Sequence, residues 1–377
     1  MGDLRELYLQ KCSDFACEPI APILEALNAG RPLGVIALDG KSKALFNDRV
    51  KPMQVFALCE SLYEYGALSV LRLSYNFLND MAAQAISRLI QVNAGLRMLD
   101  LTGNEVTGQG AAALAGVLAR PTAGLQALVL RNNPLKDAGV LEIAEMLRNN
   151  TSLTMLDLGD THCGIQGLIG LATALTDGNS TLKILDLEDP VVQGPQDSTF
   201  QHLTRMLAVN SSLTELSLAK HRMTDPQLDM LVTYGFARSK APWTSLSLRG
   251  NHLSPFAGPT LERLLSFCPR LQRLNLSSNA LGNDGAVSLS RCLAYCAELR
   301  ELDVRSNAIG DVGLMALAGV LQLVHTLEVF MLWGNNFGPG TCRALADALQ
   351  HPSLRRLRTD VRPYTVDGEV MLALQDV

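Results

Sequence analysis

The sequence is poor in aromatic residues, which make up 5% of its 377 positions and include two Trp. A core built from large rings is therefore excluded, whereas the 47% of apolar residues supply enough Leu, Ala and Val for an aliphatic core. The formal net charge of −5 is mild, and Lys and Arg nowhere form a dense block. Nucleic acid is therefore not an expected partner.

Long hydrophobic runs are absent too: none reaches the ~18 residues that a membrane-spanning helix needs. The N-terminal stretch MGDLRELYLQKCSDF is charged and lacks the apolar centre of a secretion signal. The eight cysteines follow no disulfide spacing. We therefore expect a cytoplasmic protein with reduced thiols that does not use a membrane.

Sequence motifs of catalysis are also missing. The six His lie far apart, and no H-E-x-x-H, C-x-x-C, G-x-S-x-G or phosphate-loop motif occurs. Cys292 and Cys296 stand one helical turn apart and could hold half of a metal site, but no second pair with ligand spacing accompanies them. We expect a non-enzyme without catalytic residues, cofactor, metal or small-molecule substrate.

What the sequence does contain is a repeat with the pattern L-x-x-L-x-L-x-x-N, as in LDLTGNEVTGQG from Leu99 to Gly110. Successive copies begin 27 to 35 residues apart, and 28 or 29 is the usual spacing. Weaker copies keep the apolar residues but lose the Asn. The thirteen copies begin at Leu4, Leu33, Leu68, Leu96, Leu125, Leu153, Leu182, Leu213, Trp243, Leu271, Leu299, Leu327 and Leu354.

One repeat predicts one strand and one helix. Leu at every second position is typical of a short strand with one buried face, and stretches such as GAAALAGVLAR have helical periodicity. The Asn amide can satisfy backbone groups where the chain leaves the strand. This long repeat resembles that of ribonuclease inhibitor, which implies an α/β leucine-rich-repeat horseshoe with parallel strands on the concave face and helices on the convex face.

The repeats predict a single solenoid of about thirteen units over residues 1–358, followed by a capping tail over residues 359–377. The 35-residue spacing after Leu33 contains DGKSKALFNDRVKP, which predicts a strand-to-helix loop. Its Lys41, Lys43, Arg49 and Lys51 could touch an acidic partner, although a solvated loop is the alternative. Near Pro190 and Pro195 we predict a wider loop, a continuing stack and a helix starting close to Ser198.

Side chains that alternate with the Leu residues should face a partner on the concave side. Three zones are expected there: an acidic middle, a basic stretch and an apolar spot with Trp and Met. The candidate binding residues are Asp157, Asp186, Glu188, Arg249, Arg273, Arg305, Val329, Met331 and Trp333. Two alternatives stay open: Trp333 could instead pack beneath the last repeat or the C-terminal tail, and the acidic zone could be a solvated face.

Several irregular stretches carry a narrower resemblance. LDLGDTHCGIQGLIGLATALT, LEDPVVQGPQDSTFQHLTRML, LSLAKHRMTD, LWGNNFGPGTCRALAD and TDVRPYTVDGEV follow one another in an order similar to that of the leucine-rich-repeat-containing protein 34 family. The tail TDVRPYTVDGEV is the most specific of them, since no general repeat rule demands it. The resemblance also implies a further C-terminal segment beyond position 377.

That resemblance implies a scaffold or adaptor in the axoneme of motile cilia or flagella, at the radial spokes, with radial-spoke or dynein-associated subunits as partners. It implies no catalytic residue. A nucleolar adaptor is an alternative that the family also suggests. The repeat class resembles the Ran GTPase-activating protein and immune receptors as well, so regulation of a GTPase or inhibition of a nuclease is a second alternative.

Overall fold

The computed structural model describes residues 4–194 and 196–376. These residues form two compact units, Met1–Thr199 and Phe200–Val377. Each unit is a stack of strand–helix repeats. The prediction of one uninterrupted solenoid over residues 1–358 stays a prediction, because each unit is defined by itself.

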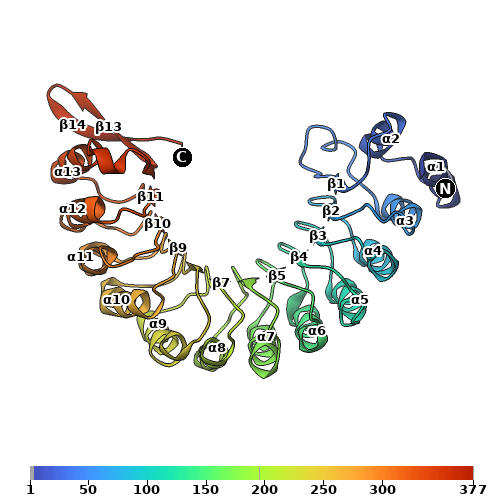
Figure 1. Cartoon of the computed structure of the whole chain (residues 1–377), viewed down its shortest axis with the longest axis horizontal. Coiled ribbons are helices and arrows are strands. Elements are labelled where there is room, and N and C mark those ends of the chain that lie inside the picture. The colour runs from blue at the N-terminus through green and yellow to red at the C-terminus, as the bar shows by residue number, and fades with distance from the viewer. Residues whose placement is uncertain (1–3, 195, 377) are drawn as a thin grey trace. The chain divides into compact units, whose positions relative to one another are not determined.

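The first unit contains six short parallel strands that pair in chain order, each in register with the next. In Figure 1 these strands line one side of the unit, and helices α3 to α7 line the other. The strands are β1 (Val35–Ala37), β2 (Val70–Arg72), β3 (Met98–Asp100), β4 (Ala127–Val129), β5 (Met155–Asp157) and β6 (Ile184–Asp186). The helices are α1 (Leu4–Asp14), α2 (Ala21–Asn28), α3 (Pro52–Ser61), α4 (Asp80–Val92), α5 (Gly108–Leu118), α6 (Lys136–Asn149) and α7 (Ile165–Asp177).

The second unit repeats this arrangement with six more parallel strands in chain order. They are β7 (Glu215–Ser217), β8 (Ser245–Ser247), β9 (Arg273–Asn275), β10 (Glu301–Asp303), β11 (Val329–Met331) and β12 (Arg358–Thr359). Helix α8 (Asp197–Val209) crosses the boundary between the units. It is followed by α9 (Asp225–Met230), α10 (Gly258–Phe267), α11 (Gly282–Leu293), α12 (Asp311–Val320) and α13 (Pro339–Leu349).

Twelve of the thirteen predicted repeat starts lead into one of these strands, from Leu33 before β1 to Leu354 before β12. The prediction at Leu4 is wrong, because Leu4–Asp14 is helix α1. Within this helix Tyr8 is 1% exposed, and its hydroxyl accepts a hydrogen bond of 2.8 Å from the Ile20 backbone N–H. The Leu residues of this segment occur at both helical and strand spacing, so the sequence alone is ambiguous over so short a stretch. In the structure the segment packs as a helix.

The Asn of each regular repeat is buried and joins two repeats, as its amide chemistry predicts. Asn104 is 5% exposed; its Nδ2 donates to the carbonyl oxygens of Leu101 (2.8 Å) and Leu73 (2.9 Å). Its Oδ1 accepts from the backbone N–H groups of Asn76 and Leu78, each at 3.0 Å. Since the bonded backbone groups would otherwise be buried without a partner, the Asn side chains tie each strand exit to its neighbour.

Three repeats beside the boundary lack this Asn, and the third has the buried His221 in its place. Thr161 occupies the position in one of them, and its hydroxyl donates to the Leu158 carbonyl oxygen at 2.7 Å. Pro190 occupies it in the next, and proline has no amide to donate. The helix after Pro190 begins at Asp197, so Ser198 lies inside its first turn instead of capping it. Pro195 lies outside the described residues.

A second set of bonds between repeats caps the helices. Asp137 on α6 accepts hydrogen bonds from the backbone N–H groups of Gly164 (2.7 Å) and Gly167 (2.8 Å) at the start of α7. Asn283 on α11 accepts in the same way from Gly310 and Gly313 at the start of α12, at 2.9 Å each. The first N–H groups of a helix have no partner within it, so α7 and α12 each depend on the preceding helix for these bonds.

The tail after the last repeat forms an antiparallel hairpin of β13 (Val361–Val366) and β14 (Glu369–Leu374). The hairpin lies against α13. Val361 is 1% exposed, while Tyr364 and Met371 face solvent on the outer side. The hairpin thus lies where a cap was expected; that the tail serves as one stays a prediction. Among the described residues, the helices fall short of the length and apolar character that crossing a membrane requires.

Replacing Asn335 by Ala tests the Asn ladder. Its Nδ2 donates to the Val304 and Leu332 carbonyl oxygens at 3.0 and 2.8 Å, and its Oδ1 accepts from the Asn307 and Ile309 N–H groups at 2.9 and 3.1 Å. We expect Asn335→Ala to lower the free energy of unfolding by ~2–4 kcal/mol, measured by urea denaturation, because several buried groups lose their partner.

Asn336→Ala is the matched control, since the neighbouring Asn336 side chain is exposed. We expect its effect to stay within about 0.5 kcal/mol. Equal losses for the two variants would contradict the structural role of Asn335.

Candidate protein-binding surfaces

The predicted acidic zone of the first unit surrounds one arginine. The guanidinium of Arg131 lies 2.9 Å from a carboxylate oxygen of Asp157, 2.6 Å from one of Asp186 and 3.0 Å from one of Glu188. The four side chains are 13–28% exposed. The zone is therefore a half-buried ion-pair network and not a freely solvated acidic face. We call these four residues the Arg131 network.

Gly159 makes this network possible. Arg131, Gly159 and Glu188 each lie two residues beyond the end of a strand, on the adjacent strands β4, β5 and β6. A Cβ atom on Gly159 would lie 2.4 Å from Nη2 of Arg131. The missing side chain lets the guanidinium cross one strand and reach carboxylates on the next.

The charges of the Arg131 network do not balance, since three carboxylates meet one guanidinium. Burial works to lower the pKa of Arg131, but the carboxylates of Asp186, Asp157 and Glu188 outweigh it and raise that pKa. Burial raises the pKa of Asp186, and the nearby Asp157 carboxylate raises it further. The network therefore holds its carboxylates together only while Arg131 is present.

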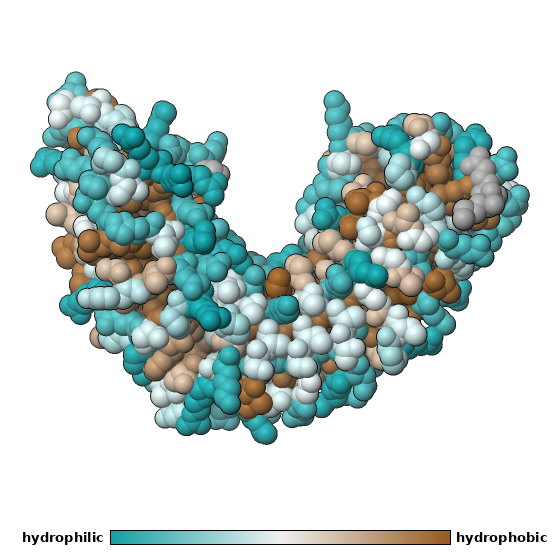
Figure 2. All heavy atoms as spheres, in the orientation of Figure 1, coloured by the Kyte–Doolittle hydropathy of each residue, from teal (hydrophilic) through white to brown (hydrophobic). Residues whose placement is uncertain are grey.

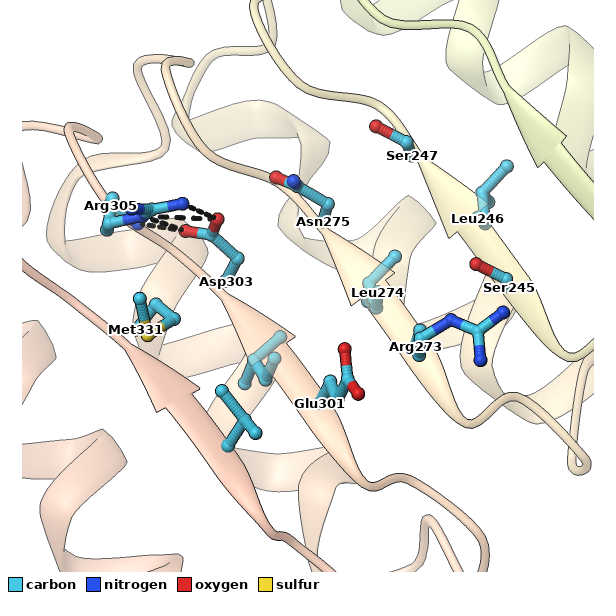
Figure 3. A pocket seen from close by; sticks show the side chains of 12 residues that line it. Ser245, Leu246, Ser247, Arg273, Leu274, Asn275, Glu301, Asp303, Arg305 and Met331 are labelled. Carbon is cyan, nitrogen blue, oxygen red and sulfur yellow. Dashed lines mark hydrogen bonds and ion pairs between the residues drawn. The ribbon is translucent and has the colours of Figure 1, made fainter. Parts of the chain in front are cut away.

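In the second unit, the sheet carries a groove of about 350 Å³ across β8 to β11. Figure 3 shows Ser245 and Ser247 on β8, Arg273 and Asn275 on β9, and Glu301 on β10 around it. Four of the predicted binding residues line this groove: Arg273, Arg305, Val329 and Met331. We call it the sheet-face groove.

Both arginines of the groove are paired within the unit. Arg273 reaches across Ser245 on β8 to Glu215 on β7, with Nη2 at 2.6 Å from the carboxylate. Arg305 binds Asp303 with two nitrogens, the shorter contact being 2.7 Å, and this hydrogen bonding raises the pKa of Arg305. Two arginines of the predicted basic stretch, Arg273 and Arg305, are therefore ion-paired, which is visible for Arg305 in Figure 3.

The open positions of the groove mix polar and apolar groups. Glu301 is exposed, and Val329 and Met331 on β11 are half-buried. In Figure 3 the Met331 side chain lies beside the Arg305–Asp303 pair, while Glu301 and Arg273 occupy the opposite side. Apolar area bordered by polar groups on a rigid sheet is typical of surfaces that bind protein segments.

Trp333 lies outside the groove lining. It is half-buried, its ring centroid is 5.8 Å from that of Phe337, and its backbone N–H donates to the Asp360 carboxylate. It is thus neither a free anchor nor a core residue. Arg249, also predicted to bind, follows β8 but does not line the groove either.

Sequence reasoning missed the role of Arg131, although Glu188, one of its partners, was among the candidate binding residues. The available signal was the small residue between them, Gly159, because a long side chain can cross a strand only over a small one. The same signal marks Arg273, whose path crosses Ser245.

The comparisons with known proteins support the repeat class. A family model described as Leucine Rich repeat matches residues 92–115, 267–290 and 295–318. Together with the strand–helix stack and the Asn ladder, this match shows that the chain folds as leucine-rich repeats. Its solenoid is of the α/β type of ribonuclease inhibitor.

Ribonuclease inhibitor is also among the relatives. The mouse protein (Mus musculus) is 30% identical over 214 residues, which cover 57% of this chain and 46% of that protein. The pig protein (Sus scrofa) is 26% identical over 74% of this chain and 59% of its own length. NACHT, LRR and PYD domains-containing protein 5 of Bos taurus is 30% identical over 63% of this chain and 21% of its own length. The chain thus spans between about a fifth and three fifths of these relatives.

Replacing Arg131 by Met tests the electrostatics of its network. We expect a loss of ~1–3 kcal/mol in the free energy of unfolding at pH 7.5, because three partly screened carboxylates lose their counter-ion. Arg131 lowers the pKa of Asp186, so in its absence that pKa rises further in the folded state and protonation of Asp186 favours folding as the pH falls. Urea denaturation at pH 4.5 should therefore show a smaller loss. A loss that is unchanged or larger at pH 4.5 would contradict the network.

Gly159→Ala should reproduce the loss of stability expected for Arg131→Met without removing any charge. We expect ~1–2 kcal/mol of destabilisation, because the new methyl group displaces the Arg131 guanidinium. In the Arg131→Met background the same change should cost much less, which a double-mutant cycle measures. Gly66→Ala is the control, since a Cβ there meets nothing within 4 Å. Additive effects of the two substitutions would exclude the proposed contact.

Proposed function

We propose that the protein is a non-catalytic scaffold that binds a segment of a partner protein in the sheet-face groove. The groove supports this because it combines the apolar Val329 and Met331 with the exposed Glu301 on a rigid parallel sheet. Leucine-rich-repeat proteins generally bind other proteins, and their stacked repeats form extended binding surfaces. A surface that is already ordered lowers the entropic cost of binding.

We further propose that the scaffold works in the axoneme of motile cilia, at the radial spokes, with radial-spoke or dynein-associated subunits as partners. The support is the resemblance of the irregular stretches, above all the tail TDVRPYTVDGEV, to the leucine-rich-repeat-containing protein 34 family. Mass spectrometry of isolated, demembranated axonemes tests this placement. Absence of the protein from them would contradict the ciliary proposal but leave the binding proposal intact.

A second candidate function is inhibition of a nuclease. It rests on the 30% identity to mouse ribonuclease inhibitor over 214 residues. Titrating the purified protein into a pancreatic-type ribonuclease assay tests it. Inhibition that disappears when Asp157 and Asp186 are replaced by Lys would favour this function, and an unchanged rate would argue against it.

Met331→Lys tests the groove itself. The new charge occupies the apolar side of the groove, so we expect capture of cross-linked partners from ciliated cells to fall at least tenfold. Val312→Lys is the control, because Val312 is 65% exposed on α12 of the same unit. Both variants should melt within a few degrees of the wild type, since neither residue is part of the core. Equal capture by the two variants would contradict binding in the groove.

A further inference from the structure

The loop between β1 and α3 is fastened to the next repeat instead of being free in solvent. Figure 1 shows it as the longest connection of the first unit. The Gly40 backbone N–H donates to the Ser74 carbonyl oxygen at 2.9 Å, and the Val50 N–H donates to Asn76 Oδ1 at 3.0 Å. Leu45 and Val50 are 5% and 2% exposed. The loop therefore has a defined shape that binding need not create.

Two of its cations lie over aromatic rings of the following repeat. The ammonium group of Lys41 is 3.4 Å from the ring centroid of Tyr75, and the guanidinium of Arg49 is 4.1 Å from that of Phe77. Each contact lies within the range of a cation–π interaction. The stacking fixes the direction in which the Arg49 guanidinium presents its donors.

A pocket of about 470 Å³ opens between this loop and the next repeat. Phe46 and Phe77, which are 61% and 57% exposed, contribute apolar surface to it, and Arg49 and Lys51 contribute charge. Pro52, the first residue of α3, also lines it, so the positive end of that helix lies at the pocket. We call it the loop pocket.

The loop pocket contains an unsatisfied donor. Nε of Arg49 is buried and has no hydrogen-bond partner among the residues that the structure describes. Arg49 as a whole is half-buried and lines the pocket, so an incoming oxygen anion meets a guanidinium that still has an unused donor. Asp48 does not meet this need, since it pairs with Lys51 at 3.6 Å and both side chains are at least 70% exposed.

We propose that the loop pocket binds an acidic peptide segment of a partner protein. A carboxylate of the peptide accepts from Arg49, with Lys51 beside it, and an adjacent apolar side chain lies against Phe46 and the open edge of Phe77. This site is separate from the sheet-face groove, so it does not depend on the function proposed for that groove.

The loop pocket favours a peptide over a nucleic acid. Successive bases need free aromatic faces for stacking, and the cations of Lys41 and Arg49 already cover one face of Tyr75 and of Phe77. The chain carries a net charge of −5, whereas nucleic-acid sites depend on an extended basic surface. The positive charge of one such pocket is enough to pair with a few carboxylates, which an acidic peptide supplies.

Fluorescence anisotropy with a labelled peptide of sequence Asp-Glu-Leu-Glu-Asp tests the proposal on the full chain. We expect saturable binding that weakens as salt rises, and at least tenfold weaker binding by Arg49→Met and by Phe46→Ser. Arg31→Met, which removes an exposed charge of the same unit, and Phe256→Ser, which removes a ring that is 85% exposed, should bind like the wild type.

Four results would overturn the proposal. They are no saturable binding up to ~1 mM peptide, equal binding of a Lys-Lys-Leu-Lys-Lys peptide, equal weakening by Arg31→Met, and displacement of the peptide by millimolar inorganic phosphate or a ten-nucleotide oligothymidylate. Far-UV circular dichroism of each variant checks that folding is unchanged. Since Phe46 is exposed, its variant reports on binding even where Arg49→Met alters the loop.

Discussion

The structure depends on one constraint: the backbone groups at the exit of each strand are buried and must be paired by the next repeat. The Asn side chains do this, as Asn104 does by linking the exits of β2 and β3 with both its donors and its acceptor. Asp137 and Asn283 meet the same need at the helix starts. No repeat is complete alone, and stacking in register follows directly. The register then decides which side chains become neighbours on the sheet.

Register explains the charge pattern of the sheet face. Adjacent parallel strands lie ~4.8 Å apart, so a column of side chains at that spacing crowds like charges together. The protein relieves this crowding in the same way in both units. Arg131 crosses Gly159 to Asp186 and Glu188, and Arg273 crosses Ser245 to Glu215. A long cation placed beside a small residue thus pairs with carboxylates two strands away and offsets part of their charge.

The two surfaces proposed to bind partners differ in how they arise. The sheet-face groove uses positions that every repeat has, where the apolar Val329 and Met331 lie in the same lining as the ion-paired Arg273 and Arg305. The loop pocket instead needs the irregular 35-residue repeat after Leu33, whose extra length carries Arg49 over Phe77. The regular repeats form the rigid frame, and the irregular repeat adds a binding site that the regular repeats lack. Figure 2 shows that the visible face mixes hydrophilic residues with residues of intermediate hydropathy and with hydrophobic ones.

The sequence by itself determined the repeat, twelve of the thirteen strand positions and the role of the Asn, because spacing alone sets which face of a strand is buried. It also located the loop after Leu33. Only the tertiary structure decided that Leu4–Asp14 is a helix, since its apolar residues satisfy two periodicities and packing chooses between them. The structure likewise decided that Asp157, Asp186 and Glu188 all pair with Arg131. It also placed the Trp333 ring against Phe337, outside the groove. Such pairings depend on whether a side chain can extend past its neighbour to a partner on another strand. The distance between these side chains is set by the packing of the strands, which the sequence alone does not give.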